Sequence, residues 1–207
     1  YIHLAYMTGI LPIKKYGTHS ALNMFDEFSM TNPGPLAEYV GFTEAEVRKL
    51  CETYGRNLEE MKEWYDGYHF INAESVYSPR SVVTAVLTGV CDSYWNKTET
   101  FEALRIYIDM NFEGLKDDVL SMLAGERVPV NTGSFSNDMT TFHTEDDVLT
   151  LLIHLGYLGY DFYNKDVFIP NNEIRGEYVN AIAASEWGEV SLALKNSADT
   201  LRAIWQK

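Results

Sequence analysis

Hydrophobic positions recur along most of the chain at the 3/4 spacing of amphipathic helices. This periodicity, read with the capping signals, predicts helices at about 44–54, 58–65, 79–88, 98–110, 115–123 and 145–155, then one that contains Ile174, Tyr178 and Ile182. The starts carry recognisable caps: a Thr43/Glu46 capping box, Asn57, Ser78 before Pro79, Thr144, and Asn171 or Asn172. Gly55, Gly89 and Gly156 mark the ends of three of these helices.

Short runs of β-forming residues separate the helices. They predict strands at 1–8, 68–70, 75–77, 128–131, 139–142, 158–163 and 167–170, with a possible partner for the first strand at 24–31. The last two form a hairpin around a three-residue turn, Asn164-Lys165-Asp166. Helix, hairpin and helix then follow one another from Thr144 onward, which resembles half of a winged-helix module. The fold class expected is α+β, mainly α.

The chain ends in a further amphipathic segment, 186–206. Its apolar residues fall on one seam: Trp187, Val190, Leu194, Ala198, Leu201 and Trp205. A seam of this width needs a partner surface. The segment therefore either folds back onto the body of the protein or pairs between copies, so a homo-oligomer is one expectation.

Composition and charge restrict the classes of binding partner that the chain can have. The 207 residues carry a formal net charge of −14, from 30 acidic and 16 basic side chains. A field of this sign repels nucleic-acid backbones and anionic membrane surfaces. From 144 to 186 eight acids face two bases, Lys165 and Arg175, a balance of −6 that cannot supply the cations a DNA site needs. We therefore expect no nucleic-acid and no membrane partner.

No catalytic or metal-binding motif stands out. The two cysteines, Cys51 and Cys91, form no CxxC, and the five histidines form no HxxxH pair, so no metal site is expected and a reducing cytoplasm fits best. No phosphate loop, nucleophile elbow or membrane span is present. The GxxG of Gly156 and Gly159 is best interpreted as a buried turn. The acids at 117–118 and 145–147 lie in first turns of helices, where the helix dipole favours them.

Two arginines and one aromatic cluster remain as candidates. Arg80 follows Ser78-Pro79 in a helix start, where a cation is disfavoured, so we expect it to pair with a carboxylate or to bind an anion. Arg175, flanked by Glu173 and Glu177, is expected to be an ion-pair hub. The aromatics of 64–77 are interpreted as core, with a cofactor box as the less favoured alternative.

Six stretches together resemble one family. They are YMTGILP at 6–12, ALNMFDEFSM at 21–30, WYDGYHF at 64–70, VYSPRSV at 76–82, LGYL at 155–158 and IPNNEIR at 169–175. In this order they resemble the AAA-ATPase-like proteins of gut bacteria, which join an N-terminal P-loop ATPase to, usually, a C-terminal PD-(D/E)xK nuclease-like domain. The resemblance covers nearly the whole chain.

The resemblance implies a position within a longer protein. Residues 1–33 would end the ATPase core, with Thr8 and Gly9 at the end of a sensor-1-like strand and open to a nucleotide-sensing role. Residues 34–138 would form a helical lid, and 139–207 a winged-helix-like module with the C-terminal amphipathic helix. The partners implied are the ATPase core upstream and a nuclease-like domain downstream.

Two functional hypotheses follow. In the first, the chain is a regulatory or relay module without a catalytic site of its own; ATP and Mg²⁺ belong to the parent, which would be the ATPase. In the second, it is a stand-alone helical protein-binding or oligomerisation module. A GK[ST] loop encoded in frame upstream of Tyr1 would decide for the first.

Overall fold

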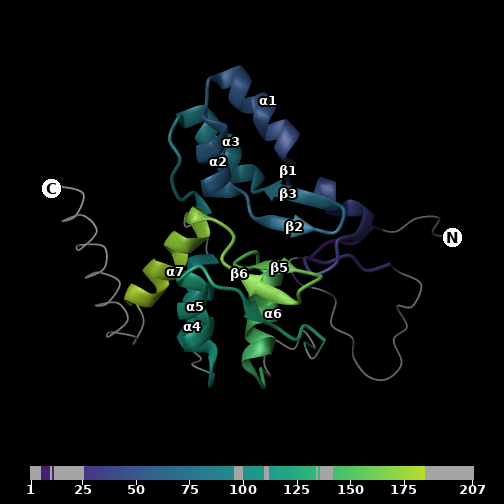
Figure 1. Ribbon diagram of the computed structural model, residues 1–207, viewed down its shortest axis with the longest axis vertical. Coiled ribbons are helices and arrows are strands. Elements are labelled where there is room, and N and C mark those ends of the chain that lie inside the picture. The colour runs from purple at the N-terminus through teal and green to yellow at the C-terminus, as the bar shows by residue number, and fades with distance from the viewer. Residues whose placement is uncertain are drawn as a thin grey trace.

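The structure is a computed structural model that describes residues 6–9, 11, 26–95, 100–109, 112–133, 135 and 142–184. About half of the described residues are helical, and the fold is α+β (Figure 1). The described ranges contain eight helices, counting one 3₁₀ helix, and two small three-stranded antiparallel sheets. These elements form two lobes, residues 34–95 (first lobe) and residues 100–184 (second lobe).

The first lobe packs three helices against one sheet. In chain order its elements are η1 (Gly34–Tyr39), β1 (Phe42–Thr43), α1 (Glu44–Tyr54), α2 (Leu58–Tyr65), β2 (Tyr68–Phe70), β3 (Ala73–Tyr77) and α3 (Pro79–Thr88). The strand order is β1-β3-β2, with Phe42 opposite Tyr77. Nine buried residues form the core of this lobe, among them Val47, Met61 and Val82.

The second lobe packs four helices against one sheet and has a larger core. Its elements are α4 (Thr100–Asp109), α5 (Leu115–Leu123), β4 (Val128–Pro129), α6 (Glu145–His154), β5 (Gly159–Asp161), β6 (Asp166–Phe168) and α7 (Asn172–Ala184). The strand order is β4-β6-β5. Its buried cluster runs from Leu104 in α4 to Ile182 in α7, so one core unites elements on both sides of residue 138.

Local capping explains where these helices begin. The Glu46 carboxylate accepts the Thr43 backbone N–H at 2.9 Å, and Asn57 Oδ1 accepts the N–H of Glu59 at 2.9 Å. Asn171 Oδ1 accepts the N–H of Ile174 at 3.0 Å, which identifies Asn171 as the cap of α7. Gly55 ends α1 with a φ of +64°, a conformation that glycine adopts without strain. The expected starts of α1, α2, α3, α5 and α6 are confirmed.

Three strand predictions need correction. Residues 6–9 lie in no strand, and Tyr6 is 81% exposed; a strand without a hydrogen-bonded neighbour has nothing to hold it. In place of a second strand reaching residue 31, Ser29 and Asn32 pair with each other and close a tight turn. The hairpin of the second lobe pairs Asp161 with Asp166, so its turn has four residues. Residues 1–5, 139–141 and 186–206, with the predictions made for them, lie outside the described residues.

Candidate functional site

The junction between the lobes is organised by one buried carboxylate. Glu173, in the first turn of α7, is 1% exposed. Its Oε1 accepts three hydrogen bonds from the first lobe: the Tyr94 backbone N–H at 2.7 Å, the Trp95 backbone N–H at 3.0 Å and the Ser81 hydroxyl at 3.0 Å. Glu173 therefore ties α7 both to α3 and to the segment that follows α3.

Two opposing effects act on the pKa of Glu173: burial of the carboxylate and the hydrogen bonds that it accepts. Desolvation raises the pKa of Glu173, while the bonds from Tyr94, Ser81 and Trp95 oppose that rise. Ser81 lies in the first turn of α3, so the positive ends of two helix dipoles face this carboxylate. Its second oxygen, Oε2, is buried without a hydrogen-bond partner among the described residues.

A second buried carboxylate lies one turn further along α7. Glu177 is fully buried, and its Oε1 accepts the Ser93 hydroxyl at 2.6 Å. Burial raises the pKa of Glu177, and its charge in turn raises the pKa of Glu173. Two like charges at i and i+4 repel each other, so this pair of carboxylates gives the junction a built-in sensitivity to protonation.

The segment that Glu173 and Glu177 hold is anchored in the first lobe. The Tyr65 hydroxyl donates to the backbone carbonyl of Asp92 at 3.0 Å and accepts the Asp92 N–H at 2.9 Å. The ring of Trp95 meets that of Tyr157 edge-on, with centroids 6.0 Å apart. Residues 91–95 therefore act as a strap between the two lobes, and we call them the strap below.

A close backbone contact completes the junction beside β2 and β5. The Tyr68 hydroxyl donates to the Gly156 carbonyl at 2.7 Å, and the Asn171 side-chain amide donates to the Asp66 carbonyl at 2.7 Å. Gly67 has a φ of +109°, and a Cβ there would lie 2.1 Å from the Pro170 carbonyl oxygen. Only glycine fits at this position.

A cavity of about 210 Å³ opens at the same junction. It is lined by Met30, Val40, Tyr68, Phe70, Val76, Tyr77, Ser78, Pro79, Trp95, His154, Leu155 and Gly156. Both lobes thus contribute to its wall. His154, the last residue of α6, is 9% exposed and stacks at a tilt on Phe135 with ring centroids 5.5 Å apart. Burial lowers the pKa of His154 to about 4 against the opposing effect of Glu27, so the imidazole is neutral at pH 7.

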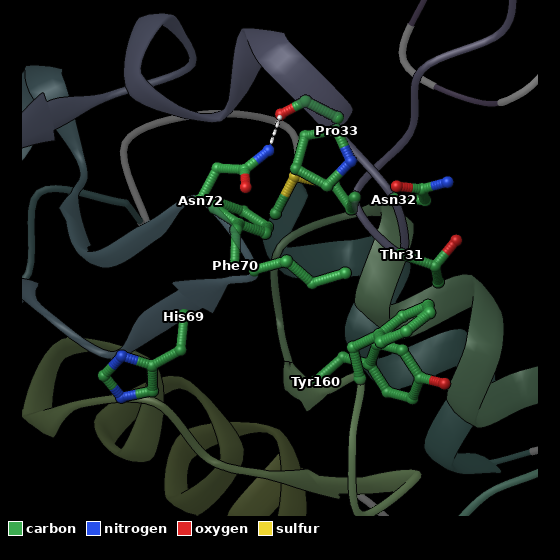
Figure 2. Close-up of a pocket in the computed structure, with 11 residues that line it drawn as sticks. Thr31, Asn32, Pro33, His69, Phe70, Asn72 and Tyr160 are labelled. Carbon is green, nitrogen blue, oxygen red and sulfur yellow. Dashed lines mark hydrogen bonds between the residues drawn. The ribbon is translucent and has the colours of Figure 1, made fainter.

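A smaller pocket lies beside β2 and is drawn in Figure 2. Its volume is about 30 Å³, room for about one water molecule. The Asn72 side-chain amide donates to the Gly34 carbonyl at 3.2 Å across it, with Pro33 and Phe70 close by (Figure 2). This pocket has no space for a substrate.

The residues singled out by sequence do not gather into one site. Thr8 and Gly9 are exposed in an irregular segment. Arg80 and Arg175 are exposed in the first turns of α3 and α7, so they flank the junction. Within the described part of the chain neither guanidinium forms an ion pair.

The ion-pair hub expected at Arg175 is wrong because its two flanking acids turn inward. Glu173 and Glu177 bind the strap and α3 instead. Sequence reasoning missed both as junction residues, although their i, i+4 spacing beside Ile174 and Tyr178 places them near the apolar face of α7. The GxxG segment is buried, as predicted, and its turn at Gly156 leads into β5, which begins at Gly159.

Comparison of the chain with protein families, with curated proteins and with solved structures finds no significant match. Across the ranges that the structure describes, no three His, Cys, Asp or Glu side chains gather as metal ligands would. Among the described helices, none combines the length and apolar character that a bilayer crossing requires.

Proposed function

We propose that this chain is a relay module, the lid and winged-helix part of an AAA-ATPase-like protein. It carries no catalytic site of its own and transmits the nucleotide state of an ATPase core to a following domain. In this proposal ATP and Mg²⁺ are bound by the parent's core, with Thr8 and Gly9 near the nucleotide.

The arrangement of the second lobe supports the winged-helix part of the proposal. A helix, α6, precedes the β5–β6 hairpin, α7 follows it, and β4 pairs with β6 at the far side of the hairpin. This order of helix, hairpin and helix resembles half of a winged-helix module. The expected lid, residues 34–138, would consist of the first lobe, with α1, α2 and α3 over one small sheet (Figure 1), together with α4 and α5.

The single observation that carries the relay role is the Glu173 junction. A relay must pass movement from one lobe to the other, which requires contacts that do not slip. Separating the lobes would break three hydrogen bonds to one carboxylate at the same time, which is costly. Movement of the first lobe is therefore passed to α7.

The test uses the full-length parent. Its reading frame upstream of Tyr1 is expected to encode a GK[ST] phosphate loop. With that protein, hydrogen exchange of residues 91–95 and 172–178 is measured with and without Mg²⁺-ATP. Protection that changes with nucleotide supports the relay; a frame without the loop, or exchange that ignores nucleotide, overturns it.

A second candidate, a stand-alone protein-binding or oligomerisation module, is favoured by α3. This helix exposes Val83 (42%) and Leu87 (66%), which are four residues apart and so lie on one face, and Val90 (57%) follows it. The test is sedimentation velocity of the wild type and of Leu87→Asp, with Ile71→Asp as the control on a turn elsewhere. A dimer that is lost only in Leu87→Asp supports this role. A wild type that stays monomeric at about 0.1 mM excludes oligomerisation as the function of this surface.

A further inference from the structure

We infer that the cavity at the lobe junction is a binding site for a small, neutral, planar aromatic molecule of about two fused rings. The site is independent of the proposed relay role, because it rests only on the wall of the cavity and on one histidine. Nothing in the relay proposal requires a ligand there.

The wall of the cavity selects for apolar and aromatic character. The rings of Tyr68, Phe70 and Trp95 come from β2 and the strap, and Met30, Val40 and Leu155 add aliphatic surface. Among the residues that line it there is no Asp, Glu, Lys or Arg. An ionised ligand would lose its hydration with no opposite charge to replace it, so a neutral ligand is favoured.

Among the polar side chains that line the cavity, which include Ser78, Tyr68 and Tyr77, His154 is the one that we expect to orient the ligand. His154 is about nine-tenths buried and lines the cavity, and its ring makes no hydrogen bond to a described residue. A neutral imidazole offers one donor and one acceptor. Because no described residue uses the ring nitrogens of His154, a ligand can, so an N–H or O–H on the aromatic ring system is expected to bind here.

The volume sets the size of the ligand. An apolar cavity of about 150 Å³ accommodates one benzene ring. The 210 Å³ at this junction therefore suits a bicyclic ring system better than a single ring, and it is too small for a nucleotide. Indole, with two fused rings and one N–H, has the required chemistry and is the probe of choice.

The experiment is isothermal titration of the full chain with indole at pH 7. We expect saturable binding with a Kd below about 1 mM, a modest affinity for nine non-hydrogen atoms. Val40→Trp fills the rim of the cavity and should abolish binding. Val83→Trp, at a valine of similar exposure on α3 that does not line the cavity, is the matched control and should bind as the wild type does.

Two further titrations separate the polar anchor from simple apolar filling. His154→Leu should weaken indole binding about fivefold or more, and His154→Gln should restore most of it. Indole-2-carboxylate, which adds a charge, should bind at least about tenfold more weakly than indole. Absence of saturable heat for indole, or undiminished binding in Val40→Trp, overturns the inference; equal affinity for the charged analogue overturns the neutral-ligand assignment.

Discussion

The Glu173 carboxylate accepts the backbone N–H of Tyr94 at 2.7 Å, a contact between residues 79 apart in the sequence. It is the shortest of the three bonds that converge on one oxygen of Glu173. The donors come from two places in the first lobe and the acceptor from one helix of the second. A single buried side chain thus fixes how the two lobes meet.

Truncation of this side chain should be far more damaging than neutralising it. Glu173→Ala leaves two backbone N–H groups and one hydroxyl without their acceptor and should lower the free energy of unfolding by about 3 kcal/mol. Glu173→Gln keeps an acceptor at Oε1 and should lower the free energy of unfolding by less than half of that amount. Urea denaturation followed by circular dichroism measures both. Glu63→Ala, at an exposed position of α2, is the control and should change stability by less than about 0.5 kcal/mol. Equal losses for Ala and Gln would contradict the bonding described.

The second carboxylate predicts a pH dependence of known sign. Burial raises the pKa of Glu177 above its ordinary value of 4.5, so near and above that value the folded state holds more protons than the unfolded state. The contribution of Glu177 to stability therefore falls as pH rises through the folded-state pKa. Glu177→Gln keeps the acceptor for Ser93 and removes this loss. Its melting temperature relative to wild type should be higher at pH 7 than at pH 4. A difference that stays constant over this range would show that Glu177 is not held in a desolvated site.

The protonation of His154 changes the stability of the fold in the opposite direction, because it lowers stability as pH falls. Its pKa is lowered to about 4, so between 6.5 and 4 the unfolded state takes up the proton first. The stability that neutral His154 contributes is complete above about pH 6.5 and is lost as pH falls toward 4. In an NMR titration its Cε1–H resonance should move only below about pH 5. A midpoint at or above pH 6 would place the ring in water and not against the cavity.

Gly67 should be the least replaceable of the glycines at the junction. Gly67→Ala combines a φ of +109° with a Cβ 2.1 Å from the Pro170 carbonyl oxygen, and should cost at least about 2 kcal/mol. Gly55→Ala is a matched control, because Gly55 also has a positive φ, of +64°, but has open space around its Cβ position. It should cost about 1 kcal/mol. Thermal melts of the two variants compare them directly, and equal effects would mean that the lobes do not approach closely at Gly67.

The sequence predicts the helices well because their limits depend on neighbours a few residues away. Thr43 with Glu46, Asn57, and Ser78 before Pro79 each fix a helix start through bonds within one turn, and Gly89 ends α3 in the same local way. The junction could not be predicted in this manner. Glu173 finds its donors 78 to 92 residues away, and its position near the apolar face of α7 does not show where those donors lie.

The cavity and the strand pairing also depend on residues that are far apart in the sequence, so local patterns do not predict them. Phe70 and His154 come together only because β2 meets the end of α6 across the lobes. The β-forming residues of 1–8 predict a strand, but propensity does not show whether a partner strand lies beside it. Residues 6–9 are irregular in the structure. The predicted hairpin turn, 164–166, differs from the observed one, 162–165, because Phe162 and Tyr163 are β formers that propensity assigns to the strand, whereas Asp166 pairs with Asp161.

The most direct test of the account is hydrogen exchange of Glu173→Ala compared with Glu63→Ala. If Glu173 holds the two lobes as one unit, Glu173→Ala will speed exchange on both sides of the junction, at residues 91–95 in the strap and at residues 172–178 in α7, while α1 stays unchanged. Faster exchange confined to α7, with residues 91–95 as protected as in the Glu63→Ala control, would show that the strap is held by the first lobe alone and would contradict the account.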